Sequence, residues 1–407
     1  MILDADQNRI VATARCIFFA ALITCVPAAC GGGGGGGGGP TIDANSHVGI
    51  GAPAPKIAGV QVVQNGIVAP RLAVRFEEFD APVLDQLRDR EQLEAVIAGA
   101  DSEFEKMLAL KEWVAEQWPA GSPSPYPPWN AIDILDWIRL GVTGGFCAQY
   151  SQVLLQSMAS LGMTARYVEI GSTYNPYAHF VIEAWSNDYN KWVVLDADYN
   201  LHFERDGIPL SALEVHDALL ASQLGDVDVV QGEFREGHPD PEVWPKWTVE
   251  LYYYLRFHLK ANHLSVTNEP PFDRYGDMVE WSDEATVPWE QSTEPSSYRK
   301  ERLTNQVISD PGLLNSALNQ VVATVDSQTE DEIVLSFQNN VLDFERYQIR
   351  LSHPRMTAGP WQDLDSASFV WRPSVLAHVL EVRGVNTRGV PGFTTIVVAD
   401  LTLHTRR

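Results

Sequence analysis

The placement of the cysteines limits how this chain of 407 residues can be stabilised. Three of the four cysteines, Cys16, Cys25 and Cys30, lie near the N-terminus, and only Cys147 lies further along. The rest of the chain cannot form an internal disulfide, and its solitary thiol, Cys147, is expected to be either buried or used. Because 407 residues exceed what one hydrophobic core usually organises, two or three domains are expected.

The chain is strongly acidic, with a formal net charge of -24. A hydrophobic content of 45% and 12 tryptophans are typical of an ordered globular protein. The negative field repels nucleic acid and anionic lipid headgroups, and no basic cluster opposes it. We therefore expect no nucleic-acid partner and no membrane binding through a basic surface.

Residues 1–29 have the features of a secretory signal peptide. The apolar stretch 16–29 follows Arg9 and Arg15 and ends in two alanines. It is shorter than the about 20 apolar residues that span a bilayer. We therefore expect export and cleavage near residue 30.

The segment after this stretch resembles the lipidation site of a bacterial lipoprotein: Pro27-Ala28-Ala29-Cys30, followed by glycines 31–39. The resemblance implies that Cys30 carries the lipid, with Cys25 as a second candidate. A glycine run is a flexible coil, so residues 30–56 are expected to be a lipidated cysteine, tether and linker. This anchor would be the protein's only membrane contact and would hold it in the cell envelope, at the outer membrane or facing the periplasm. Simple secretion is the alternative.

Residues 57–266 are expected to form one domain with a small N-terminal β appendage. Two apolar runs flank Asn65-Gly66, which is typical of a hairpin. The segment 102–118 predicts a helix with a capping box at its start. Helical patterns follow at 209–222 and 246–264.

The remaining residues predict a connecting segment, 267–317, and a C-terminal β-sandwich, 318–407. Short β-type runs separated by turns are typical of antiparallel sandwiches. There are six, at 321–325, 332–337, 346–351, 368–371, 378–386 and 394–401. The last two runs and the Gly-Val-Pro-Gly segment near them resemble the final hairpin of fibronectin type III or immunoglobulin-like modules.

Cys147 is predicted to begin a helix. Apolar residues recur after it at helical spacing, and Gly162 stands where a left-handed cap is needed. Gly144 and Gly145 let the backbone approach a substrate closely, while the helix N-terminus favours a thiolate, the form that attacks carbonyl carbon. The alternative is a buried cysteine that acts as a small apolar side chain.

Residues 178–185 and 191–196 are predicted to form a hairpin through the turn Ser186-Asn187-Asp188-Tyr189. If Trp185 pairs with Asn190, His179 lies directly opposite Asp196, where a carboxylate can orient the imidazole. A register shifted by one residue would place His179 and Asp196 on opposite faces of the sheet. Asp198 would lie diagonally, beyond the strand. Taken singly, His179 reads as a partly buried surface histidine and Asp196 as a polar strand end.

Three segments together, GGFCAQYSQVLLQSMASLGMTARYVEI, AHFVIEAW and KWVVLDADYN, are similar to the core of the transglutaminase-like superfamily, relatives of papain-type thiol enzymes. The resemblance covers about residues 100–200. It implies an α+β fold in which the Cys147 helix packs on an antiparallel sheet that carries His179 and Asp196, and acyl-enzyme chemistry on amide bonds. For the oxyanion, the backbone N–H of Cys147 is the first candidate donor. Trp129 and Trp137 are further candidates.

These features predict a cell-envelope thiol enzyme that acts on a protein or peptide substrate through Cys147, His179 and Asp196, either by hydrolysis or by transfer to an amine. The rival hypothesis is a non-catalytic surface protein that binds a glycan or a protein. We expect no cofactor and no metal. The segment from Asp196 imitates a calcium loop but lacks its glycine and final glutamate, and His258 and His263 are five residues apart, unlike a helical zinc pair. The sequence does not specify an oligomeric state.

Overall fold

The computed structural model of the protein describes residues 55–173, 179–233, 245–266, 278–283 and 306–402. The predicted signal peptide and the candidate lipidation sites Cys25 and Cys30 lie outside these residues. Within the described ranges, no helix is both long and apolar enough to cross a membrane.

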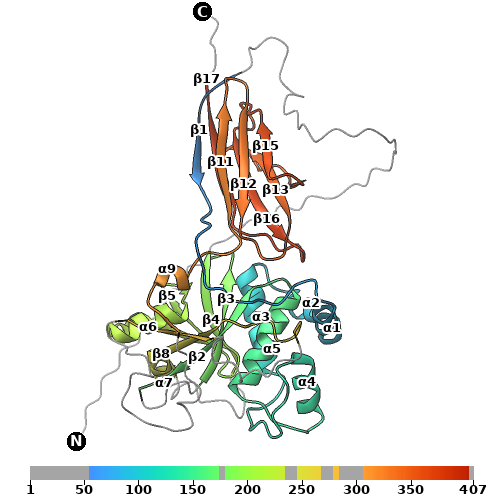
Figure 1. Cartoon of the computed structure of the whole chain (residues 1–407), viewed down its shortest axis with the longest axis vertical. Coiled ribbons are helices and arrows are strands. Elements are labelled where there is room, and N and C mark those ends of the chain that lie inside the picture. The colour runs from blue at the N-terminus through green and yellow to red at the C-terminus, as the bar shows by residue number, and fades with distance from the viewer. Residues whose placement is uncertain (1–54, 174–178, 234–244, 267–277, 284–305, 403–407) are drawn as a thin grey trace, which may run out of the picture. The chain divides into compact units, whose positions relative to one another are not determined.

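A large mixed sheet forms the centre of the first half of the fold (Figure 1). Its strand order is β10-β9-β8-β2-β3-β4-β5-β6, with β7 also paired to β5. Neighbouring strands are antiparallel except β9 and β10, which are parallel. The strands are β2 (Ala165–Gly171), β3 (His179–Ser186), β4 (Lys191–Asp196), β5 (Leu201–Arg205), β6 (Ile208–Pro209), β7 (Asp228–Gln231), β8 (Tyr254–His258), β9 (Met278–Trp281) and β10 (Val307–Ile308).

Helices cover both faces of this sheet. On one face α5 packs against β2 and β3, and α1, α3 and α4 pack around α5. The other face is covered by α6 and the short helix that precedes β8. The helices are α1 (Pro82–Glu91), α2 (Leu93–Val96), α3 (Glu103–Ala115), α4 (Ala131–Arg139), α5 (Cys147–Ser160), α6 (Ala212–Leu220), α7 (Pro245–Glu250) and α9 (Pro311–Leu314).

Alternation along the strands explains why two separate cores form. In β2 and β3, Tyr167 and Ile182 face the α5 side, whereas Val168 and Val181 face the α6 side. Every residue of α5 is buried, so this helix lies at the centre of the larger core. A fully buried α5 gives its first residue, Cys147, a fixed position.

The local signals for α3 and α5 are confirmed. Ser102 and Glu105 form the predicted capping box at the start of α3. Cys147 is the first residue of α5, and Gly162 after its end has the left-handed φ of +78°. The start of α3 and the end of α5 are therefore set by residues next to those termini.

The predicted helix at 246–264 is wrong beyond Tyr253. The α-helix ends at Glu250, a 3₁₀ turn covers Leu251–Tyr253, and Tyr254–His258 is strand β8, which pairs with β2 and β9. Aromatic residues favour strands, and β8 fills the position between β9 and β2, which is far from it in sequence. Similarly, β9 belongs to the sheet although it lies within the predicted connecting segment. The zinc argument from helical spacing does not apply, because His258 is in a strand.

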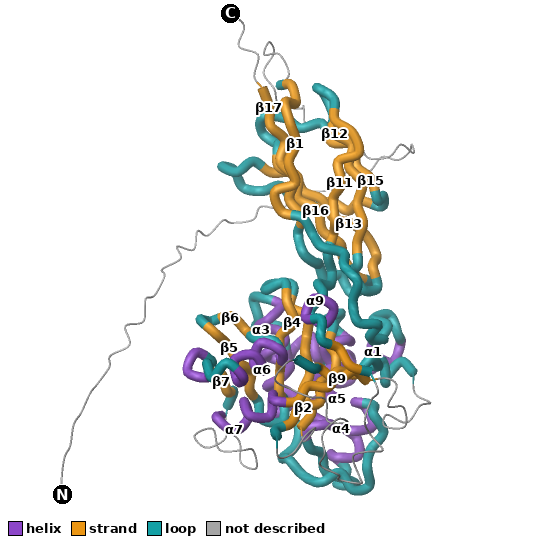
Figure 2. Tube along the Cα trace, turned by 60° about the vertical axis from the view of Figure 1, so that its left-hand side comes forward, coloured by secondary structure: helices purple, strands orange, loops and turns teal. Residues whose placement is uncertain are grey.

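The C-terminal residues form the predicted sandwich of two sheets (Figure 2). One sheet has the order β1-β17-β16-β13-β14 and the other β11-β12-β15. All six predicted runs are strands. The elements are β1 (Lys56–Gln64), β11 (Val321–Gln328), β12 (Ile333–Asn339), β13 (Phe344–Ser352), β14 (Gln362–Leu364), β15 (Ser368–Trp371), β16 (Val379–Asn386) and β17 (Thr395–Thr402).

The predicted hairpin at Asn65-Gly66 is not formed, because β1 pairs with β17 instead of with the residues that follow it. The Asn65 side chain exchanges two hydrogen bonds with the backbone of Ala323, at 2.9 and 3.2 Å. A Cβ on Gly66 would lie 2.3 Å from the Val321 carbonyl oxygen. Asn65 and Gly66 therefore allow the chain to pack closely on β11. The expected N-terminal appendage is instead an edge strand of the C-terminal sandwich.

Candidate active site

Cys147 lies at the N-terminus of α5 and is only 6% exposed. The two preceding glycines are required by the protein's own packing. A Cβ on Gly144 would lie 2.8 Å from the Ser122 carbonyl oxygen, and one on Gly145 would lie 2.6 Å from Trp118 Nε1. The backbone N–H of Gly121 also donates to the Gly145 carbonyl at 2.7 Å. The loop after α3 is therefore fixed directly beside the thiol-bearing turn.

The β3–β4 hairpin has a different register from the predicted one. Ser186 pairs with Lys191 and Trp185 with Trp192, so the predicted Trp185–Asn190 pair is wrong. Asn190 instead joins a four-residue turn, where its φ is +53°. The difference is two residues, which returns every side chain to the same face of the sheet. His179 and Asp196 therefore still meet, but diagonally instead of directly.

The structure brings His179 and Asp196 into contact. His179 Nε2 lies 2.7 Å from Asp196 Oδ2, and both side chains are buried. The other oxygen of Asp196 accepts a hydrogen bond from the backbone N–H of Tyr199 at 3.0 Å. The Tyr199 ring stacks on the imidazole with centroids 4.4 Å apart. These contacts fix both the carboxylate and the plane of the imidazole.

The second imidazole nitrogen faces the thiol. Because Nε2 is engaged by Asp196, Nδ1 is the ring nitrogen left to interact with the Cys147 thiol, and this interaction contributes to the raised pKa of His179. Asp198 Oδ2 lies 4.0 Å from the same nitrogen. Ligand-type atoms of Cys147, His179 and Asp198 all lie within 4.8 Å of one another. Asp198 thus belongs to the site, although the sequence placed it outside the hairpin contact.

The electrostatics favour a charged imidazole. Burial lowers the pKa of His179, but the charge and hydrogen bond of Asp196, with a further contribution from Cys147, raise that pKa well above the ordinary 6.5. The pKa of Asp198 is raised to about 7, mainly by burial. The charge of His179 lowers this pKa, and the charge of Asp196 raises it. An imidazolium held by Asp196 stabilises a thiolate on its other side.

A tryptophan that sequence reasoning missed lies next to this centre. The indole N–H of Trp118 is buried, contacts the Gly145 position, and has no hydrogen-bond partner among the described residues. Of the two tryptophans named from the sequence, Trp129 donates to the Tyr126 hydroxyl at 3.3 Å and Trp137 is half-buried on α4. Nothing in the sequence distinguishes Trp118, because its position depends on how the following loop folds back.

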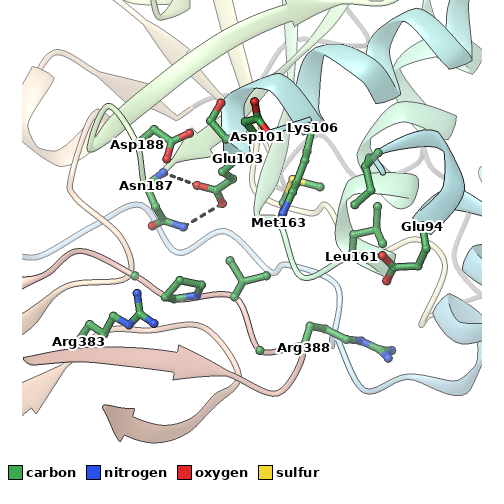
Figure 3. A pocket seen from close by; sticks show the side chains of 16 residues that line it. Glu94, Asp101, Glu103, Lys106, Leu161, Met163, Asn187, Asp188, Arg383 and Arg388 are labelled. Carbon is green, nitrogen blue, oxygen red and sulfur yellow. Dashed lines mark hydrogen bonds between the residues drawn. The ribbon is translucent and has the colours of Figure 1, made fainter. Parts of the chain in front are cut away.

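A cavity of about 460 Å³ lies elsewhere and does not include the thiol site (Figure 3). Glu103, Lys106 and Met163 line one side, and Arg383 and Arg388 of the sandwich line the other. The Glu103 carboxylate accepts two hydrogen bonds from Asn187, at 2.8 and 2.9 Å. Cys147, His179 and Asp196 do not line this cavity.

Comparison with protein families matches one segment of the chain. Residues 90–197 fit the family model described as the transglutaminase-like superfamily. Comparison with curated proteins gives no match. The matched segment contains α5, β2, β3 and β4, and with them Cys147, His179 and Asp196. Residues 90–197 are therefore a transglutaminase-like segment of this chain.

Proposed function

We propose that the protein is a thiol acyl-transfer enzyme that acts on amide or peptide bonds, with Cys147 as nucleophile, His179 as base and Asp196 as the residue that orients His179. The main support is the arrangement of the imidazole. One nitrogen is held by Asp196 at 2.7 Å, and ligand atoms of His179 and Cys147 lie within 4.8 Å of each other. This is the order of contacts that nucleophile, base and orienting group require.

In the first half-reaction, His179 Nδ1 takes the thiol proton and the Cys147 sulfur attacks the substrate carbonyl carbon. The carbonyl oxygen becomes an oxyanion, which needs hydrogen-bond donors. The backbone N–H of Cys147 at the start of α5 is one such donor, and the indole N–H of Trp118 is a second. The imidazolium then gives its proton to the leaving amine as the C–N bond breaks, which leaves a thioester on Cys147.

The second half-reaction releases the acyl group. Water or an amine attacks the thioester carbon, His179 takes the attacking group's proton, and the sulfur leaves and is reprotonated. Hydrolysis and transfer to an amine use the same residues. We propose hydrolysis as the main reaction, because water is always present at the site. A protein or peptide is the proposed substrate.

The proposed location is the cell envelope. It depends on the apolar stretch 16–29 and on Cys30 with its glycine run. A lipid on Cys30 would keep the acidic protein at a membrane surface that its own charge repels. Mass spectrometry of the N-terminal peptide from the exported protein tests this part separately, since an unmodified N-terminus would contradict it.

Alkylation of Cys147 tests the catalytic proposal without knowledge of the substrate. Iodoacetamide reaction is followed against pH by peptide mass spectrometry, which separates Cys147 from the other three cysteines. We expect the wild type to react faster at neutral pH than His179→Ala, which should react as an unassisted thiol with a pKa of about 8.5. The matched control is His202→Ala, which removes another buried histidine paired with a carboxylate, Glu204, at 2.9 Å.

The control variant should keep the wild-type pH dependence. If His179→Ala and the wild type show the same profile, with reaction only above about pH 8, the thiol is not activated. The binding-protein hypothesis would then be preferred. Circular dichroism of each variant shows whether the fold is retained.

A further inference from the structure

The thiol site contains one carboxylate that the proposed mechanism does not use. Asp198 lies in the turn after β4, is 8% exposed, and faces the thiol side of the imidazole. With Cys147 and His179 it forms a buried group of sulfur, nitrogen and oxygen atoms within 4.8 Å of one another. A thiolate, an imidazole and a carboxylate are the three ligand types that zinc binds in proteins.

The spacing of these atoms suits a tetrahedral ion. Zinc binds sulfur at about 2.3 Å and nitrogen or oxygen at about 2.1 Å, so its ligand atoms lie roughly 3.4 Å apart. The observed distance from His179 Nδ1 to Asp198 Oδ2 is 4.0 Å. A side-chain adjustment of well under 1 Å would close this gap, which ordinary rotamer freedom allows.

The second imidazole nitrogen already has the contact that a metal-binding histidine needs. Such histidines donate their other ring N–H to a carboxylate or carbonyl, which fixes the tautomer. His179 Nε2 lies 2.7 Å from Asp196, and Asp196 is itself held by the backbone N–H of Tyr199. Once His179 has lost its second proton, the lone pair of Nδ1 therefore points toward Cys147 and Asp198. One dication would also neutralise the thiolate and the Asp198 carboxylate, so the buried group would carry no net charge.

We propose that Cys147 Sγ, His179 Nδ1 and the Asp198 carboxylate bind one zinc ion, and that zinc reversibly blocks the thiol. Thiolate and imidazole ligands favour zinc over magnesium or calcium. Binding releases to solvent the proton that the Cys147–His179 pair holds, forms one bond each to sulfur, nitrogen and oxygen, and leaves the fourth position to water. Zinc binding depends only on these three residues, whereas its inhibitory effect rests on the proposed function.

Zinc affinity of the full-length chain tests the site. A chromogenic chelator competes for zinc with the wild type and with Cys147→Ser, Asp198→Asn and Glu204→Gln. We expect one wild-type site that Cys147→Ser abolishes and that Asp198→Asn weakens by about 10-fold or more. Glu204→Gln, at the separate His202–Glu204 pair, should keep the wild-type affinity. The three N-terminal cysteines are present in every variant, so their contribution cancels.

Two further readouts identify the ligands. Zinc should protect Cys147 from iodoacetamide, and a chelator should restore the reaction. Cobalt in place of zinc should give a sulfur-to-metal charge-transfer absorption that is lost in Cys147→Ser. Equal zinc affinity in the wild type and Cys147→Ser, or no protection of Cys147, would overturn the proposal. Activation of the zinc-free thiol by His179 is measured separately, by the alkylation experiment. Failure of the zinc proposal is therefore distinguishable from failure of the proposed function.

Discussion

Replacing Asp196 with asparagine changes one atom and tests the orienting role directly. The Asp196 carboxylate has two acceptor oxygens, one near His179 Nε2 at 2.7 Å and one bonded to the Tyr199 N–H at 3.0 Å. Asparagine keeps only one acceptor. Because the Tyr199 N–H must find that oxygen, the amide N–H₂ would face Nε2, and Nε2 would have to become the acceptor. The imidazole proton then moves to Nδ1, which can no longer take the thiol proton.

The magnitude follows from losing both the tautomer and the negative charge. A comparable change in a serine–histidine–aspartate triad costs about 10⁴-fold in rate. We expect roughly 10³- to 10⁴-fold here, which corresponds to about 4–5 kcal/mol because each factor of ten equals about 1.4 kcal/mol. The imidazolium would also be destabilised, since the Asp196 charge raises the pKa of His179.

Acylation of Cys147 by an activated p-nitrophenyl ester measures this effect, because the released chromophore reports the first half-reaction for any acyl group. The rate is measured between pH 5.5 and 8 for the wild type, Asp196→Asn and Glu204→Gln. The Glu204 variant removes a carboxylate from a different histidine and should react at the wild-type rate. An Asp196→Asn rate within 10-fold of wild type at every pH would refute the reasoning about Asp196.

Three further predictions concern stability, each measured by urea unfolding. Burial lowers the pKa of Lys111 to about 8, so between pH 8 and 10.5 the unfolded chain binds more protons than the folded one. Stability from this group should rise with pH in that window by at most about 1.4 kcal/mol per unit, and Lys111→Met should remove the rise. Arg166→Met leaves buried Glu183 without its 2.6 Å ion pair and should cost about 3–5 kcal/mol. Gly145→Ala places a Cβ 2.6 Å from Trp118 Nε1 and should cost about 1–3 kcal/mol.

Matched variants separate these causes from general damage. Gly99→Ala meets nothing within 4 Å and should change stability by no more than about 0.5 kcal/mol. Adding Glu183→Gln to Arg166→Met should recover part of the loss, because it removes the unpaired charge. If Lys111→Met and the wild type differ by a constant amount from pH 7 to 10, Lys111 does not titrate in this window.

Local signals in the sequence were sufficient for the elements that carry the candidate site. The capping box at Ser102, the helix start at Cys147 and the left-handed Gly162 depend on residues within one or two turns. The contact of His179 with Asp196 also followed from a hairpin pattern. The hairpin register could not be predicted, because it depends on whether Asn190 enters the turn with a positive φ. Both registers leave the same residues facing the core, so the hydrophobic pattern does not distinguish them.

What the sequence did not predict depends on contacts between distant residues. The periodicity of the segment from Tyr254 does not show that it inserts between β2 and β9. Likewise, Trp118 approaches Gly145 only because a loop folds back. Asp198 lies two residues beyond Asp196, and the observed hairpin register, which differs by two residues from the predicted one, brings it towards His179.

The pairing of β1 with β17 has a consequence for the order in which the chain can fold. Lys56 and Thr402 are partners 346 residues apart in sequence, and everything from α1 to β10 lies between them. A chain synthesised from its N-terminus exposes β1 long before β17 exists, whereas the strands and helices around Cys147 are complete much earlier. The sandwich can therefore be completed only after the segment between β1 and β17, which includes the helices and strands around Cys147, has been synthesised. Losing the last strand would leave β1 without its partner, an exposed edge of the kind that leads to aggregation.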